Sequence, residues 1–222
     1  MEEIVKKALL FVCVFAFCNL TLLAQTGKEP RFGHIAEKSA VHVAPKAGSS
    51  GWQTIYSNLG PSPTALYNNT DYWYVDSFQL PAMAFVPAAN AHVTEVQLAI
   101  QLLTGGKAVY IWIAADSGGY PGNLLEGPML VTKMPAAGTC CDLTVADFLP
   151  LQVYGGQRYW VVASAPFAGS ASNFRGAWNF AYQGTNSPVS FNHGPGWMNQ
   201  PSLQQPGGAV LGTWDPTAVG CQ

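Results

Sequence analysis

Charge is scarce in this sequence. Only 10% of its 222 residues are Asp, Glu, Lys or Arg, well below the roughly 25% that is typical of soluble domains. Ten basic residues against twelve acidic ones leave no basic excess, so a nucleic-acid partner is not expected. The 12% aromatic content together with the low charge excludes an intrinsically disordered chain. The low charge also excludes a coiled coil, which needs charged residues in its heptads.

Long hydrophobic runs are missing after the first 24 residues. Met1–Ala24 carries Lys6 and Lys7 before the apolar run Ala8–Phe17, which is the pattern of a secretory signal peptide. The run is short for a transmembrane helix, so we expect cleavage after Ala24, with an uncleaved N-terminal anchor as the alternative. The mature protein is therefore predicted to be secreted and to have no contact with a membrane.

Residues 25–51 lack a sustained apolar period and end in a stretch rich in Ala, Gly and Ser, so they are predicted to form a flexible linker. Residues 52–222 contain short apolar stretches separated by turns rich in Gly and Pro. Apolar residues alternate with Gln and Ala in His92–Leu103, which predicts a strand with one buried and one solvent-facing side. Lys107–Ala115 is apolar on both faces, so we expect a central strand that forms a hairpin with His92–Leu103.

No stretch of useful length has the helical period, and about ten such strands follow one another with turns between them. This organisation predicts an all-β fold, an antiparallel β-sandwich of jelly-roll-like topology covering residues 52–222. An up-and-down β-barrel is the alternative. A domain of this size buries enough apolar surface to be stable without disulfides.

Several short segments together resemble a family of secreted bacterial β-sandwich proteins, the choice-of-anchor domains, over about Gln53 to Trp214. The segments are Ile55–Leu59, Ala84–Pro87, Ile111–Gly122 with Leu124 and Leu125, Gly138–Cys141 and Tyr159–Val162. The resemblance implies export, a sandwich fold and no established enzymatic activity. Many relatives resemble surface proteins with a C-terminal sorting signal, but Trp214–Gln222 has no apolar tail. We therefore expect free secretion.

Three cysteines follow the predicted signal peptide, namely Cys140, Cys141 and Cys221. The cysteines of an exported protein tend to oxidise. Either Cys140 or Cys141 bonds to Cys221, or Cys140 and Cys141 form a vicinal disulfide; free thiols are the third interpretation. Both disulfide arrangements leave one thiol over, which would allow a disulfide-linked dimer.

The candidates for metal binding and catalysis are weak. Asp116 stands among glycines in a loop that could hold Ca²⁺, but calcium loops supply more than one carboxylate, so we favour an Asp116 side chain that caps its own loop backbone. The four histidines lie far apart, which leaves no zinc spacing. Glycoside hydrolysis needs two facing carboxylates, and the acidic residues lie in no recognisable motif. We predict no cofactor and no enzymatic activity; a glycoside hydrolase is a remote alternative.

The aromatic residues give the best indication of function. Tyr72, Trp73 and Tyr74 follow Asn and Asp residues, Trp178 is flanked by Asn and Gln, and Trp197 lies in a polar, Gly-rich stretch. Aromatic faces beside hydrogen-bonding side chains suit sugar rings. The alternative for the Trp178 segment is that its aromatics alternate because one sheet face is buried. We predict a non-enzymatic module that binds a polysaccharide or another extracellular surface, and a structural or matrix protein acting by self-assembly is the alternative.

Overall fold

The structure is a computed structural model that describes residues 30–35, 51–61, 65–166, 173–182, 188–194 and 196–216. The described residues form strands and turns and contain no α-helix. The strands are β1 (Phe32–His34), β2 (Gln53–Ser57), β3 (Tyr67–Asp76), β4 (Leu80–Phe85), β5 (Ala91–Leu98), β6 (Ile100–Thr104), β7 (Val109–Asp116), β8 (Pro121–Val131), β9 (Thr144–Val153), β10 (Tyr159–Ser164), β11 (Arg175–Ala181), β12 (Val189–Asn192), β13 (Trp197–Gln200) and β14 (Gly208–Trp214).

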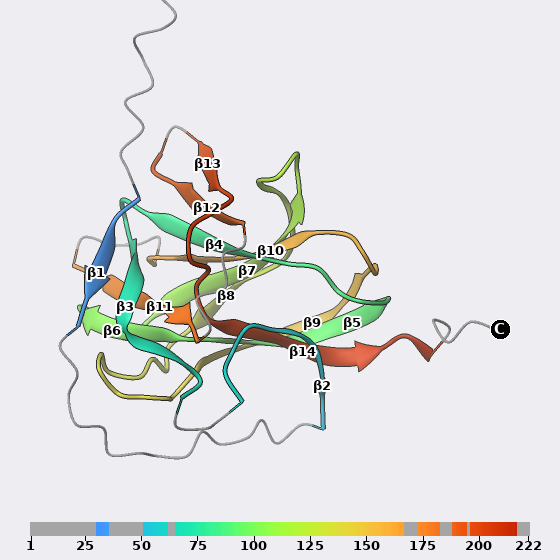
Figure 1. Cartoon of the computed structure of the whole chain (residues 1–222), viewed down its shortest axis with the longest axis horizontal. Coiled ribbons are helices and arrows are strands. Elements are labelled where there is room, and N and C mark those ends of the chain that lie inside the picture. Colours follow the sequence, from blue (N-terminus) through green and yellow to red (C-terminus); the bar gives the residue numbers. More distant parts are fainter. Residues whose placement is uncertain are drawn as a thin grey trace, which may run out of the picture.

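The strands form three sheets arranged as a sandwich (Figure 1). The six-stranded sheet has the order β13-β12-β4-β10-β7-β8, and the two four-stranded sheets have the orders β1-β3-β11-β6 and β2-β14-β5-β9. The ladders that join these strands are antiparallel. The all-β sandwich fold is thereby confirmed. Most neighbouring strands are distant in the sequence, as in jelly-roll-like topologies.

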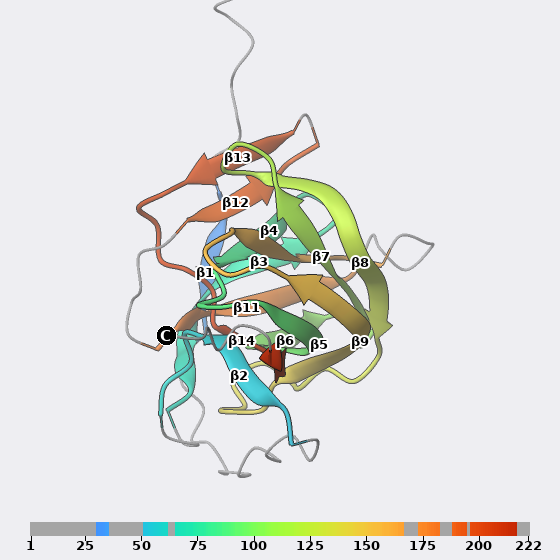
Figure 2. The ribbon, with the colours of Figure 1, turned by 90° about the vertical axis from the view of Figure 1, so that its right-hand side faces the viewer.

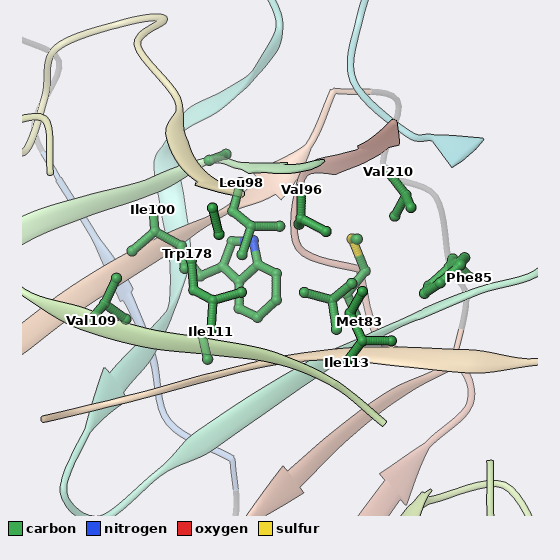
Figure 3. Close-up of a cluster of buried hydrophobic side chains, with 14 of the residues drawn as sticks. Met83, Phe85, Val96, Leu98, Ile100, Val109, Ile111, Ile113, Trp178 and Val210 are labelled. Atoms are coloured by element: carbon green, nitrogen blue, oxygen red, sulfur yellow. The ribbon is translucent and has the colours of Figure 1, made fainter. Parts of the chain in front are cut away.

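The main core lies between the six-stranded sheet and the two four-stranded sheets (Figure 3). Ile111 and Ile113 on β7 face Val96 and Leu98 on β5, and the ring of Trp178 on β11 lies among these side chains. All five are fully buried. β-Branched and aromatic side chains pack well on a pleated surface. The alternate apolar positions of β5 and β7 therefore orient these two strands with the same face toward the core.

The predicted strand His92–Leu103 is interrupted at Ala99. The segment before it is β5 and the segment after it is β6, and these belong to different four-stranded sheets. The amide of Ala99 donates to Gly207 at 3.0 Å, and its carbonyl accepts from Asn179 at 2.9 Å. One continuous stretch of chain therefore joins the two smaller sheets into one layer.

The predicted hairpin between His92–Leu103 and Lys107–Ala115 is wrong. β6 pairs with β11, whereas β7 pairs with β10 and β8. The chain crosses from one layer to the other after Gly105, so the two strands do not share a ladder. The prediction that Lys107–Ala115 is an interior strand is confirmed, because β7 has a partner on each side.

Gln101 also departs from the sequence prediction, which placed it on a solvent-facing side. It is fully buried. Its Nε2 donates to the Thr139 carbonyl at 2.7 Å and to the Tyr67 hydroxyl at 3.0 Å, and its Oε1 accepts from Gly138 at 2.9 Å. A buried amide costs little when it is hydrogen-bonded, and the loop containing Gly138 supplies these partners from a distant part of the chain.

Part of the predicted linker 25–51 is a strand. β1 pairs antiparallel with β3, so that Phe32 lies opposite Trp73 and His34 opposite Asp71. Three residues carry too short a pattern to be recognised as a strand, and the partner that holds them lies on β3. Of the predicted linker, the structure describes only residues 30–35 and Gly51. The predicted signal peptide and Cys221 also lie outside the described residues.

The burial of Trp178 at the centre of the main core implies that its removal destabilises the fold. We expect Trp178→Ala to lower the free energy of unfolding by about 3–5 kcal/mol, because it removes a large buried ring and leaves a cavity. Leu149→Ala is the control, since Leu149 is 73% exposed on β9, and it should stay within about 0.5 kcal/mol of the wild type. Chemical denaturation followed by fluorescence measures both; equal effects would contradict the assigned core.

Candidate functional site

Two of the tryptophans predicted to bind a ligand lie in the interior. Trp178 is fully buried, and its Nε1 donates to the Gly207 carbonyl at 2.9 Å. Trp73 is 4% exposed and packs against Phe180 and Phe191 at centroid distances of 5.2 and 4.7 Å. The prediction of a ligand-binding role is corrected for both residues, because a ring enclosed in this way has no face for a sugar.

Tyr72 and Tyr74 lie on the opposite face of β3 from Trp73, as strand alternation requires. Their rings meet edge to face at 5.2 Å, and their hydroxyl oxygens are 3.5 Å apart. Tyr72 is buried against Gly33 of β1, where a Cβ atom would overlap the tyrosine ring. Burial, and then the neighbouring Tyr74 hydroxyl, raise the pKa of Tyr72. Of this pair only Tyr74 keeps partial exposure.

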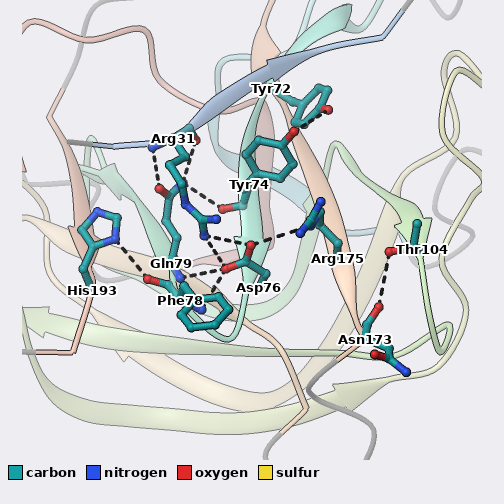
Figure 4. A network of polar contacts seen from close by, with 10 residues as sticks. All are labelled: Arg31, Tyr72, Tyr74, Asp76, Phe78, Gln79, Thr104, Asn173, Arg175 and His193. Atoms are coloured by element: carbon teal, nitrogen blue, oxygen red, sulfur yellow. Dashed lines mark hydrogen bonds and ion pairs between the residues drawn. The ribbon is translucent and has the colours of Figure 1, made fainter. Parts of the chain in front are cut away.

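A buried carboxylate stands at the end of β3 (Figure 4). Asp76 has a side chain that is only 4% exposed, and Nη2 of Arg31 donates to both of its carboxylate oxygens, at 2.7 and 2.8 Å. The backbone amides of Phe78 and Gln79 donate to its Oδ1 at 2.8 and 3.0 Å. A buried charge requires such partners, and here they include the residue immediately before β1 and the turn between β3 and β4.

The side chain of Gln79 completes the attachment of β1. Its Oε1 accepts from the Arg31 amide at 2.7 Å, and its Nε2 donates to the Arg31 carbonyl at 2.9 Å and to the Tyr74 carbonyl at 3.0 Å. The fully buried Gln79 amide group therefore bonds to the backbone at Arg31 as a neighbouring strand would. This attachment brings a residue of the predicted linker into the candidate site.

Two guanidinium groups lie over the ring of Tyr74. Arg31 is 5.6 Å and Arg175 is 5.5 Å from its centroid, and Arg31 is also 5.8 Å from the ring of Phe78. Nε of Arg175 is 4.0 Å from Oδ2 of Asp76. Cations at these distances are attracted by the ring faces. The group of Arg31, Arg175, Tyr74 and Asp76, called the arginine cluster below, carries two positive charges and one negative charge.

A cleft of about 520 Å³ lies beside the arginine cluster. It combines one exposed aromatic ring with hydroxyl, amide and guanidinium groups, on residues from the β3–β4 turn, the end of β6 and the start of β11. The lining residues are Asp76, Ser77, Phe78, Thr104, Gly105, Asn173, Phe174 and Arg175. Ligand sites commonly have this size and this mixture of apolar and polar groups.

The wall of the cleft depends on close backbone packing. Gly105 has a φ of +88°, and a Cβ there would lie 2.5 Å from the Asn173 carbonyl oxygen. The Thr104 hydroxyl donates to the same carbonyl at 3.3 Å. A side chain at residue 105 would therefore be strained and would push β6 away from the start of β11.

Trp197 lies on β13, half-buried at the outer face of the six-stranded sheet. It packs against a small cluster that contains Trp160, and Trp112 packs against the same cluster. The sequence analysis did not include Trp112 or Trp160 among the site residues. Trp197 is thus the one predicted tryptophan that keeps partial exposure.

Asp116 caps its own loop, as the sequence analysis favoured. Its Oδ2 accepts from the Gly119 amide at 3.1 Å, its Oδ1 accepts from Nε1 of Trp160 at 2.8 Å, and Arg158 lies 3.8 Å away. Within the described ranges, no three His, Cys, Asp or Glu residues form a group that could hold a metal ion.

The acidic residues Asp71 and Asp76 lie on opposite faces of β3. Asp71 pairs with Nδ1 of His34 at 2.8 Å, and that hydrogen bond lowers the pKa of the Asp71 carboxyl. Asp76, on the other face, is the carboxylate of the arginine cluster. The two carboxylates near the Tyr-Trp-Tyr motif therefore do not face each other as a hydrolytic pair would.

Cys140 and Cys141 are buried at the edge of the main core. Their sulfur atoms lie within bonding distance, and the peptide bond between them is cis. Cys221 is outside the described residues, so the pairing with Cys221 stays a prediction.

No family model matches the chain, and no curated protein matches it either. The described part of the chain has no helix with the length and apolarity required to cross a membrane. The resemblance to choice-of-anchor domains stays a prediction.

Sequence reasoning missed Arg31, Phe78, Asn173 and Arg175. One signal was present: the domain beyond residue 51 has only four basic residues, and Arg175 is one of them. Arg31 gave no comparable signal, because its role depends on contacts with Asp76 and Gln79, which are more than forty residues away.

The contacts of Arg31 lead to a stability prediction. Arg31→Ala should leave the buried Asp76 carboxylate without its main partner, at a cost of about 1–3 kcal/mol, and should speed hydrogen exchange at residues 32–35. Arg158→Ala is the control, because the pair between Arg158 and Asp116 is partly exposed and such pairs contribute less than about 1 kcal/mol. Unchanged exchange in β1 would show that Arg31 does not hold this strand.

Proposed function

We propose that the protein is an exported, non-enzymatic β-sandwich module that binds carbohydrate, and that the cleft beside the arginine cluster is its binding site. The observation that carries the proposal is the cleft itself, in which the exposed ring of Phe78 stands beside hydroxyl, amide and guanidinium groups. A sugar ring has an apolar C–H face and a rim of hydroxyls, so it needs both kinds of surface in one place.

Phe78 supports this proposal through its exposure. The side chain is 63% exposed although it belongs to a tight turn between two buried strands. Its backbone amide is bonded to Asp76, so the turn is fixed while the ring faces solvent. A large apolar ring held in this way is suited to contact a ligand at low entropic cost.

The polar groups of the cleft lie on several elements. Ser77 is in the same turn as Phe78, Thr104 ends β6, and Asn173 and Arg175 lie at the start of β11. Hydroxyl and amide groups both donate and accept hydrogen bonds, which is the requirement for sugar hydroxyls. Export is part of the proposal because Met1–Ala24 has the pattern of a signal peptide.

Phe78→Ala tests the site. We expect it to weaken binding to a polysaccharide found in a screen of residues 25–222 by about tenfold, or ~1.4 kcal/mol, as expected for an aromatic anchor. Tyr154→Ala is the matched control, because Tyr154 is also a half-exposed aromatic residue. Its amide donates to the hydroxyl of Tyr159, which pairs with Phe85 at the other end of β4. Affinity electrophoresis measures both variants.

Trp197→Ala separates this cleft from the outer face of the six-stranded sheet. If binding falls in Trp197→Ala and not in Phe78→Ala, the ligand occupies the outer face and the assignment of the cleft is wrong. If the folded wild type binds no polysaccharide, with and without Ca²⁺, the proposal of carbohydrate binding is wrong.

The β8 edge favours a second candidate function, self-assembly of a structural or matrix protein. β8 is the edge strand of the six-stranded sheet, at the right-hand margin of Figure 2. Its exposed side chains include Leu124, Leu125, Met129 and Leu130. Long apolar edge strands are sites at which chains pair, and a second copy of this chain would offer the same edge.

Assembly through β8 has a direct test. We expect the wild type to show a concentration-dependent dimer in sedimentation velocity, and Leu124→Lys to shift it toward monomer, because a charge on an edge strand opposes pairing. Lys107→Leu, outside β8, should leave the dimer unchanged. A dimer that collapses with reductant and ignores Leu124→Lys would show that the spare cysteine joins the chains instead.

A further inference from the structure

We infer that the cleft takes an acidic sugar residue, and that Arg175 binds its carboxylate. This inference rests on the proposed carbohydrate-binding function and adds the charge class of the ligand. It is carried by the charge balance of the arginine cluster, by the exposure of Arg175 and by the position of Arg175 in the cleft wall.

The positive charge at this site is unusual for the chain. Residues 52–222 contain four basic and eight acidic residues. The basic residues are Lys107, Lys133, Arg158 and Arg175. In addition, β1 brings Arg31 from the N-terminal segment to the same place. A domain of negative net charge repels anions at long range, so binding of an anion requires a local positive excess of this kind.

The single negative charge of Asp76 does not neutralise both arginines of the cluster. Its two oxygens already accept two hydrogen bonds from Arg31 and two from the backbone amides of Phe78 and Gln79. Arg175 approaches Asp76 only to 4.0 Å, at the outer limit of an ion pair, and its side chain is 52% exposed. Arg31 therefore neutralises the buried Asp76 carboxylate. The guanidinium of Arg175 remains available to bind an anionic group in the cleft.

Arg175 is also held in place. Its guanidinium lies 5.5 Å from the centroid of the Tyr74 ring, and the hydroxyl of Tyr74 is 3.5 Å from that of the buried Tyr72. Stacking on an aromatic ring restricts a guanidinium without occupying its donors in the ring plane. Those donors match the two oxygens of a carboxylate.

The cleft offers the two surfaces that a uronic acid presents. Phe78 gives an apolar face for the sugar ring, and Arg175 lines the same cleft and gives a fork of donors for its carboxylate. A neutral sugar would use only the first of these surfaces and the hydroxyl-binding groups, so charge should raise affinity at this site.

The test uses two polyuronates, polygalacturonate and alginate, each beside its carboxyl-reduced form, in which CH₂OH replaces the carboxylate. The protein is the chain from residue 25, and affinity electrophoresis or calorimetry measures binding. We expect at least one polyuronate to bind about tenfold or more tightly than its reduced form, and added salt to reduce that preference.

Arg175→Gln should abolish the preference for the charged form while leaving weak binding of the reduced form. Arg175→Lys should restore only part of the preference, because an ammonium lacks the planar fork. Arg158→Gln is the matched control: Arg158 is a partly exposed arginine paired with Asp116, away from the cleft, and its loss should leave the preference unchanged.

The outcomes separate this inference from the proposed function. If charged and reduced forms bind equally, and Phe78→Ala weakens both, the module binds carbohydrate but the acidic preference is wrong. Equal binding of polyglutamate would show recognition of carboxylates without the sugar and would overturn the inference as stated. If the folded protein binds neither form of any polymer, the inference is wrong, and a negative neutral-polysaccharide screen would then overturn the proposed function too.

Discussion

The buried carboxylate of Asp76 is the constraint on which this part of the molecule depends. A buried charge is stable only with partners that satisfy its oxygens, and these partners are Arg31, immediately before β1, and the turn between β3 and β4. Asp76 therefore holds two parts of the chain at once: through Arg31 it fixes a short N-terminal strand on the sheet, and through the amides of Phe78 and Gln79 it fixes the turn that carries the exposed Phe78 ring. The neighbouring guanidinium of Arg175 is placed against the same group by Tyr74.

The arginine cluster lies outside the hydrophobic core clusters of the sandwich. The main core lies between the sheets around Trp178, and a second cluster around Trp73 lies on the side of β3 away from Tyr72 and Tyr74. β3 thus supplies the buried ring of Trp73 on one face, and Tyr74 and Asp76 of the arginine cluster on the other. Such a division between a packed scaffold and loops at its edge is how sandwich folds commonly present binding groups.

Sequence reasoning worked where a pattern repeats along one strand. The alternation in β5 and β7 was long enough to predict the sandwich, and the apolar character of β7 on both faces predicted its place inside a sheet. The same reasoning failed for Gln101, whose polar side chain satisfies its hydrogen bonds inside the protein, and for Trp73, whose polar neighbours suggested a ligand-binding role. For Trp178 the alternative of a buried sheet face is the one that the structure shows. An indole ring flanked by amides has the same local sequence whether it lies in a core or on a surface.

The amino-acid sequence by itself determined the all-β class, the antiparallel sandwich and the shortage of positive charge, because composition and period-two alternation act locally along the chain. Only the tertiary structure decided which strands pair, which aromatic rings are buried, and that Arg31 from a segment without any pattern meets Asp76 and Gln79. Those outcomes depend on contacts between residues far apart in sequence, where hydrogen-bond satisfaction and close packing choose among many arrangements that local patterns allow equally.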